Sequence, residues 1–179
     1  MSLSHALLTC LIETPQSGYD LSKRFSESVS YFWNASQQQI YRELGKLETQ
    51  GYVVSEVIPR EGRLDKKIYS ITEEGKEYLI AWMKKPSEPD TIREDILVKI
   101  FSGSLVETKV LIADIKRRQK IHVDKLSKYK EIEEKNFAKV GELTKEEKLK
   151  YLVLKAGIRC ELEWLDWCQE ALEIVNSIT

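Results

Sequence analysis

The chain has 179 residues, of which 42% are hydrophobic and 32% charged, and its formal net charge is −1. This length suits one or two small domains, and no apolar run approaches the ~18 residues that a membrane span needs. Three cysteines without a CxxC pair and only two histidines offer no zinc-like spacing, so we expect neither a metal nor another cofactor. The N-terminus lacks the features of a signal peptide, which favours a cytoplasmic protein with free thiols.

Charge and motifs also narrow the function classes. A net charge of −1 excludes a strongly basic, nonspecific nucleic-acid binder, but a sequence-specific reader of DNA needs only one local basic face. The sequence contains no Gly-rich phosphate loop and no nucleophile elbow, so we do not expect an enzyme.

Three helices are predicted before residue 50. Apolar residues at helical spacing predict the first over residues 3–13, and "TPQSGYD" ends it. The second opens at Gly18 or Asp20 and turns Leu21, Phe25 and Val29 inward. Ser36 and Gln39 have the spacing of a capping box at the start of the third. The buried stripe of this third helix is Ile40, Leu44 and Leu47.

A hairpin and a fourth helix follow. Gly51 stands where a glycine ends a helix, and residues 52–58 and 66–71 then alternate as strands do, around a turn-forming "PREGRLD". Thr72 caps the next helix, which carries Tyr78, Leu79 and Trp82 inward. This order is that of a winged helix-turn-helix, so the predicted fold is mainly α with a small β-hairpin.

The second half is predicted to be helical. Two prolines in "KKPSEPD" place a boundary between a domain over residues 1–86 and another over 90–179. A short helix over 92–103 precedes two long amphipathic helices, over about 106–136 and over 145–175. The apolar side of the first carries Val110, Leu111, Ile115, His122, Leu126 and Tyr129. The stripe of the second is Leu149, Leu152, Val153, Ala156, Cys160, Trp164, Trp167, Ala171 and Val175. An antiparallel pair of these helices cannot by itself bury the apolar side chains of both. A second copy of the chain is the natural cover, across a two-fold axis. The residues expected in this dimer contact are Leu111, Ile115, Leu126, Leu152, Cys160, Trp164, Trp167 and Ala171.

Several stretches together carry a family resemblance. They are "SGYDLSKRF", "YFWNASQQQIYRELGKLETQGYV" and "KKIYSITEEGKEYLIAWM", with "IREDILVKIFSGS" and "CELEWLDW" in the second half. With them the chain resembles the PadR family of bacterial transcriptional regulators, in the branch with a virulence-activator-type C-terminal domain. The resemblance implies a homodimer that binds a palindromic operator on double-stranded DNA, often represses a neighbouring gene, and is often released by a small molecule.

The third helix supplies the candidate reading face. At ~100° per residue, Gln38, Arg42, Gly45 and Thr49 fall opposite Ile40. Glutamine can pair with adenine and arginine with guanine, each through two hydrogen bonds. Phosphate contacts are expected from the second helix and the hairpin. The predicted DNA-binding residues are Tyr19, Ser22, Lys23, Ser36, Gln37, Gln38, Tyr41, Arg42, Lys46, Arg60, Arg63, Lys66 and Lys67.

Other features have plainer interpretations. We expect His122 to be structural and Cys160 and Cys168 to be buried small hydrophobes rather than redox sensors. The tryptophans Trp33, Trp82, Trp164 and Trp167 are expected to pack in a core or interface, with contact to a small aromatic effector as the alternative. Two rival functions stay open: a protein-interaction module, and an effector sensor without tight DNA affinity of its own.

Overall fold

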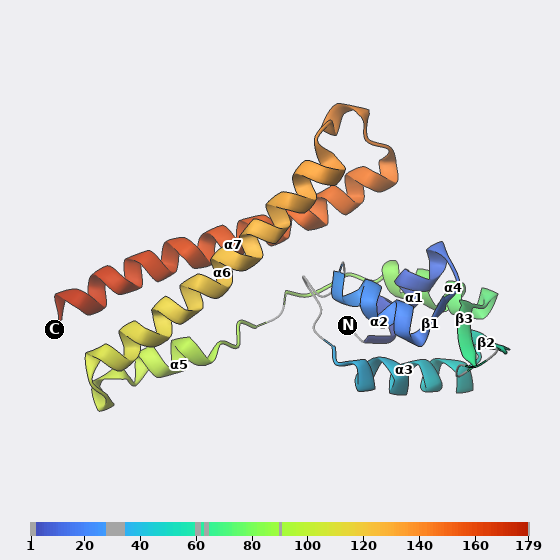
Figure 1. Cartoon of the computed structure of the whole chain (residues 1–179), viewed down its shortest axis with the longest axis horizontal. Helices are drawn as coiled ribbons and strands as arrows, with labels where there is room; N and C mark the ends of the chain where they lie inside the picture. Colours follow the sequence, from blue (N-terminus) through green and yellow to red (C-terminus); the bar gives the residue numbers. More distant parts are fainter. Residues whose placement is uncertain (1–2, 28–34, 60–61, 63–64, 90, 179) are drawn as a thin grey trace. The chain divides into compact units, whose positions relative to one another are not determined.

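The computed structural model describes residues 3–27, 35–59, 62, 65–89 and 91–178. The chain divides into two compact units, Met1–Pro89 and Asp90–Thr179 (Figure 1). Over the described ranges, no helix combines the length and the apolar character needed to cross a membrane.

The N-terminal unit follows the predicted order of helices and hairpin. Its elements are α1 (Leu3–Glu13), β1 (Gln16–Ser17), α2 (Gly18–Glu27), α3 (Gln37–Thr49), β2 (Val53–Ile58), β3 (Lys66–Ile71) and α4 (Glu73–Met83). The hairpin is part of a three-stranded antiparallel sheet in the order β1-β3-β2, so the prediction of two strands was incomplete. The missed strand β1 has two residues, too few for an alternating pattern to appear in a sequence.

Both ends of α3 are fixed by its own sequence. The Ser36 side chain accepts a hydrogen bond from the Gln39 backbone, and the Gln39 side chain accepts one from the Ser36 backbone, which confirms the capping box. At the other end Gly51 has a φ of 76°, a left-handed conformation that glycine adopts without a steric penalty. The Tyr52 amide then donates to the Leu47 carbonyl at 2.9 Å, which closes the helix end.

One hydrophobic core holds α3 in place. Leu21 and Phe25 of α2 and the predicted stripe of α3, Ile40, Leu44 and Leu47, are all at most 1% exposed. They pack with Leu7, Leu8 and Leu11 of α1, Val53 of β2, Tyr69 of β3 and Leu79 of α4. The predicted inward residues are therefore confirmed, except for Val29, which lies outside the described residues.

An aromatic stack closes the α1 and α4 side of this core. The His5 ring stacks on Trp82 at 4.4 Å and on Tyr78 at 5.0 Å between ring centroids. Tyr78 stacks in turn on Tyr52 at 4.4 Å. Burial of the His5 imidazole, together with nearby cationic groups such as Lys85, lowers its pKa. His5 is thus a core histidine that is kept neutral.

The C-terminal unit is built on two long helices. Its elements are α5 (Asp95–Phe101), η2 (Gly103–Leu105), α6 (Thr108–Phe137), η3 (Val140–Glu142) and α7 (Lys145–Ser177). Helices α6 and α7 run side by side and antiparallel, and α5 packs beside the start of α6 (Figure 1). Thr144 and Glu147 form a second capping box, at the start of α7.

Most of the predicted stripe of α7 lies beside the side that faces α6, although Trp164 of that stripe does contact α6. The residues of α7 that this unit buries are Leu154, Ile158, Glu161, Cys168, Leu172 and Val175, and only Val175 belongs to the predicted stripe. On α6 the prediction was better: Leu111, Ile115, His122, Leu126 and Tyr129 are buried, whereas Val110 is 51% exposed. Helix α7 carries two apolar stripes, and periodicity does not indicate which one its own chain covers.

A polar pair lies inside the seam between α6 and α7. His122 Nδ1 and a Glu161 carboxylate oxygen form a hydrogen bond, with both side chains 7% exposed. Trp164 stacks on His122 with ring centroids 5.5 Å apart, and the Arg118 guanidinium lies 4.2 Å from the centre of the same tryptophan ring. His122 therefore has a structural role, as predicted, but it acts as one member of a buried pair.

We predict that acidification destabilises the N-terminal unit through His5. Because its pKa is lowered in the folded state, the unfolded chain binds more protons below the ordinary value of 6.5. Stability should therefore fall between pH 7.5 and pH 5.5, above the range where carboxylates titrate. Thermal unfolding of wild type and of His5→Phe, which keeps a stacking ring, measures this contribution. It is the difference between the two proteins in the slope of stability against pH. Equal slopes in the two proteins would contradict the assignment.

We predict that Glu161→Leu destabilises the C-terminal unit by ~1–3 kcal/mol, because it leaves a buried imidazole nitrogen without its hydrogen-bond partner. The double variant His122→Leu/Glu161→Leu should regain most of this loss, since a buried pair replaced by apolar groups costs little. Denaturant unfolding of the two variants makes the comparison. If the double variant is no more stable than Glu161→Leu, the pair is not the source of the effect.

Candidate nucleic-acid interface

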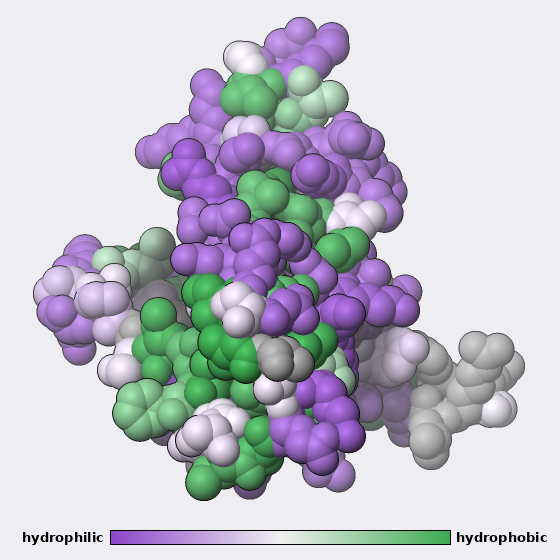
Figure 2. Space-filling model, turned by 90° about the vertical axis from the view of Figure 1, so that its left-hand side faces the viewer, coloured by the Kyte–Doolittle hydropathy of each residue, from purple (hydrophilic) through white to green (hydrophobic). Residues whose placement is uncertain are grey.

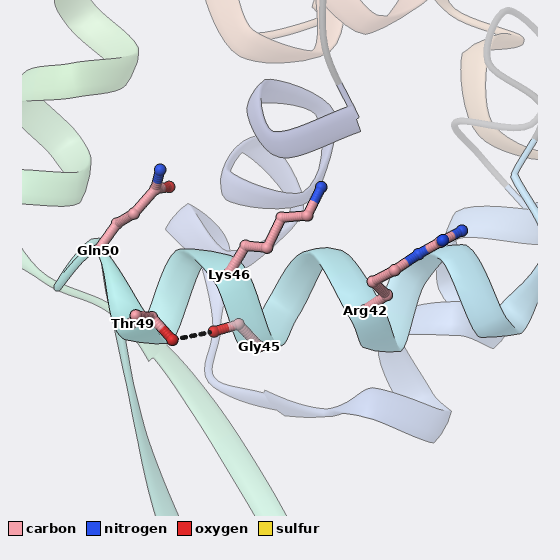
Figure 3. A pocket seen from close by; sticks show the side chains of 5 residues that line it. All are labelled: Arg42, Gly45, Lys46, Thr49 and Gln50. Carbon is pink, nitrogen blue, oxygen red and sulfur yellow. Dashed lines mark hydrogen bonds between the residues drawn. The ribbon is translucent and has the colours of Figure 1, made fainter.

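The outer face of α3 is open to solvent. Gln37, Gln38, Arg42 and Lys46 are exposed, and so is Tyr41 at 42%. In Figure 3 Arg42, Lys46 and Gln50 project from the helix around a hollow that Gly45 and Thr49 complete. The Thr49 hydroxyl donates to the Gly45 carbonyl at 2.9 Å. The predicted reading residues of α3 thus share one accessible face.

The acidic groups of α3 are engaged away from Arg42. Glu43 accepts hydrogen bonds from Ser4 of α1 and from Lys46. Glu48 accepts one from Lys67 at 2.8 Å and another from Ser55 of β2, and these bonds lower the pKa of its carboxyl group. Within the part of the chain that the structure describes, Arg42 forms no ion pair. Its guanidinium is available for a ligand.

Helix α2 presents its first turn beside this face. Tyr19 is 64% exposed, Lys23 is exposed, and Ser22 is half-buried. The Tyr41 ring of α3 lies directly against Gly18, where any side chain would collide with it. Gly18 was not among the predicted site residues, although the motif "SGYD" contains it. The contact lets α2 and α3 approach and positions the Tyr41 ring.

The hairpin of β2 and β3 is the wing, and two of its lysines, Lys66 and Lys67, pair with carboxylates of the helices. Lys66 Nζ lies 2.6 Å from Asp20 of α2, and Lys67 Nζ lies 2.8 Å from Glu48 of α3. Both lysines were predicted to contact phosphates, and their partners Asp20 and Glu48 were not predicted. Such exposed ion pairs are worth only ~0–1 kcal/mol, so a phosphate can compete for the lysines. The other two predicted wing residues, Arg60 and Arg63, lie outside the described residues.

The predicted dimer residues divide into two groups. Leu111, Ile115 and Leu126 are buried within the single chain. Trp164, Trp167 and Ala171 are half-buried beside that core, whereas Leu152 is 63% exposed and Cys160 is exposed. Within the single chain Cys168 is buried, as predicted, whereas Cys160 is exposed. Partial desolvation by neighbouring side chains and the nearby Glu161 carboxylate raise the pKa of the Cys160 thiol, which disfavours the reactive thiolate.

The chemistry of the α3 face is that of hydrogen-bond donors and positive charge. Its amide and guanidinium groups match the major-groove edges of bases, and the helix N-terminus adds backbone N–H groups and a positive dipole. Among the described residues no cluster of His, Cys, Asp and Glu could hold a metal ion.

Two family models match the chain, one in each unit. Residues 7–81 match the transcriptional regulator PadR-like family, and residues 92–176 match the virulence activator alpha C-term model. The probable transcriptional regulator Rv1176c of Mycobacterium tuberculosis is 35% identical over 98% of both chains.

Solved structures resemble the whole chain. The Vibrio cholerae virulence activator AphA is similar with a TM-score of 0.81 and 31% identity, over 99% of this chain and 100% of that one. Bacillus subtilis PadR in complex with operator DNA has a TM-score of 0.81 at 26% identity, over 97% and 98% of the two chains. The same protein in complex with p-coumaric acid has a TM-score of 0.76 at 27% identity, over 97% and 98%.

These likenesses extend over the winged helix and the paired long helices alike, in agreement with the order of elements and the exposed α3 face. The chain belongs to the PadR-like family of transcriptional regulators, with a C-terminal domain of the virulence-activator type.

Proposed function

We propose that this regulator is a homodimeric repressor that binds a palindromic operator in the cytoplasm and is released by a small molecule. The observation that carries the proposal is the exposed α3 face, where Arg42 stands without a carboxylate partner among the described residues. The B. subtilis PadR complex with operator DNA supports DNA as the ligand of this face.

In this proposal α3 enters the major groove and reads base edges. Arg42 pairs with a guanine through two hydrogen bonds, and Gln38, one turn earlier on the same side, pairs with an adenine. Tyr19, Lys23 and Tyr41 lie beside them and contact phosphates, which sets the register of the helix. Lys66 and Lys67 reach the backbone by exchanging their carboxylate partners for phosphate.

A second apolar stripe on α7 supports the dimer. Leu149, Val153, Ala156, Cys160, Trp164, Trp167 and Ala171 follow one another at spacings of three and four residues. This spacing makes a seam for another long helix. Within the described parts of the chain α6 is the one other helix of this length, and it packs mainly on the neighbouring stripe of α7, although Trp164 of the seam also contacts it. The helices of a second copy are the fitting partner.

The α5 end of the C-terminal unit adds further apolar surface. Figure 2 shows hydrophobic side chains gathered on the face where α5 and the end of α7 point toward the viewer. Phe101 is 93% exposed, Leu105 83% and Val98 68%. Contiguous apolar surface of this kind marks a contact with another protein chain, and in the proposed dimer the second copy covers it.

The small-molecule effector is the remaining part of the proposal. The complex of B. subtilis PadR with p-coumaric acid supports a small aromatic molecule. Trp82 stacks on His5, and Trp164 contacts Arg118 and His122. Side chains of the same chain therefore already cover faces of both tryptophan rings. Their contacts favour the packing role that the sequence predicted.

We predict that operator affinity of the wild type falls steeply with salt, because neutralised phosphates release their counterions. A genome-fragment selection with the purified chain supplies the operator, and titrations between 50 and 200 mM salt supply the slope, with ~10³-fold loss for about six phosphate contacts. A slope near zero would favour the rival function, a protein-interaction module whose apolar contacts respond little to salt.

We predict that Arg42→Ala lowers operator affinity by ~1–3 kcal/mol and relaxes the preference at one base pair of each half-site, because a two-bond contact to guanine is lost. The matched control is Lys76→Ala, which removes a positive charge on α4 that pairs with Glu73. Fluorescence anisotropy with the selected operator measures both. Equal affinity of Arg42→Ala and wild type would show that α3 does not read DNA through this residue.

We predict that Leu149→Glu/Leu152→Glu dissociates the dimer and lowers operator affinity roughly 100-fold, because two linked half-site contacts become independent. Both leucines are more than half exposed, at 57% and 63%, so the folded monomer tolerates the change. The control is Lys148→Glu, which changes the net charge by the same amount but lies on the side of α7 away from both apolar stripes. Sedimentation at micromolar concentration gives the oligomeric state, and an unchanged dimer in the double variant would contradict this interface.

A further inference from the structure

Gly45 is an unusual residue for the middle of α3. It lies on the exposed face between Arg42 and Thr49, and a side chain built on it would meet nothing within 4 Å. Its backbone is not in the left-handed region, so the helix accepts a residue with a side chain there, proline excepted. Glycine weakens a helix interior relative to alanine. The fold itself therefore gives no reason for glycine at this position.

A hollow lies in the contact surface that the proposed function assigns to DNA, and it is lined by Arg42, Gly45, Lys46, Thr49 and Gln50 (Figure 3). Gly45 lines the hollow with backbone atoms alone, and its carbonyl already accepts the Thr49 hydroxyl at 2.9 Å. The methylene stems of Arg42 and Lys46 flank it, and such stems offer apolar surface below a charged head. The hollow therefore suits a small apolar group.

The position of the hollow follows from helix geometry. Gly45 is three residues beyond Arg42, ~4.5 Å along the helix axis, and successive base pairs are ~3.4 Å apart. If Arg42 contacts one base pair, Gly45 faces the next. The C5-methyl of thymine is the apolar group that base edges present in the major groove.

We propose that Gly45 is a specificity-determining residue whose hollow receives the C5-methyl group of one operator thymine, beside the base that Arg42 reads. This inference rests on the proposed DNA-binding function. An alanine at residue 45 places its own methyl group in the space that the thymine methyl occupies. Gly45→Ala should therefore lose the preference for thymine and accept a base that lacks this methyl group.

The test combines a protein variant with single-atom-group changes in DNA. The full-length protein is titrated with the operator recovered by wild type, and with copies in which each thymine is replaced in turn by deoxyuridine, which lacks the methyl group. Gly45→Ala is compared with wild type and with Gly141→Ala, a control glycine that also has nothing within 4 Å but lies in the C-terminal unit. Thermal unfolding of each protein is recorded alongside.

Wild type should lose about three- to five-fold in affinity at one symmetric thymine, the effect of one buried methyl group. Gly45→Ala should bind the thymine operator roughly 5- to 150-fold more weakly, as for a mismatched base pair, and should recover with uracil at that position. Its N-terminal unit should unfold about 4–8 °C higher, because alanine favours the helix, so the weaker binding cannot come from misfolding.

Two results would overturn the inference while leaving the proposed function intact: Gly45→Ala binds the thymine operator as tightly as wild type, or its loss is the same with thymine and uracil at every position. The second would place DNA backbone, and not a base, against Gly45. Failure of wild type to recover any operator is a separate outcome, since it contradicts the proposed function itself.

Discussion

The burial of Ile40, Leu44 and Leu47 against α1 is the constraint on which the rest of the site depends. These three side chains are at most 1% exposed, and they fix the rotation of α3 about its own axis. Because a helix has one orientation once its apolar stripe is buried, the opposite stripe must face solvent. The same packing that stabilises the N-terminal unit thus presents Gln38 and Arg42.

Hydrogen bonds and ion pairs then determine the charge that the outer face of α3 presents. The two carboxylates of α3 are drawn into hydrogen bonds with α1 and the wing, through Glu43 with Ser4 and Glu48 with Ser55 and Lys67. These contacts brace α3 against its neighbours and keep negative charge engaged elsewhere than on the reading side. A chain with a net charge of −1 can in this way offer a local basic face to a polyanion.

Structure followed correctly from the sequence where a signal is local and allows one arrangement. The capping box of Ser36 and Gln39, the terminal Gly51 and the single apolar stripe of α3 each have one physical solution. Prediction failed where a segment has two solutions or depends on distant residues. Helix α7 has apolar groups on two sides, and the pairing of Lys66 with Asp20 joins residues 46 positions apart. Neither the covered stripe nor the partner of a surface lysine follows from spacing along the chain.

In the proposed operator complex, the outer face of α3 lies in the major groove and reads guanine through Arg42. Protection of guanine N7 from methylation by dimethyl sulfate tests it most directly, since N7 lies at the major-groove edge. Wild type should protect guanines at two symmetric positions about one helical turn apart, ~34–36 Å, and Arg42→Ala should no longer protect them although it still binds at low salt. An operator complex in which every guanine stays reactive, or in which both proteins give the same protection, would contradict it.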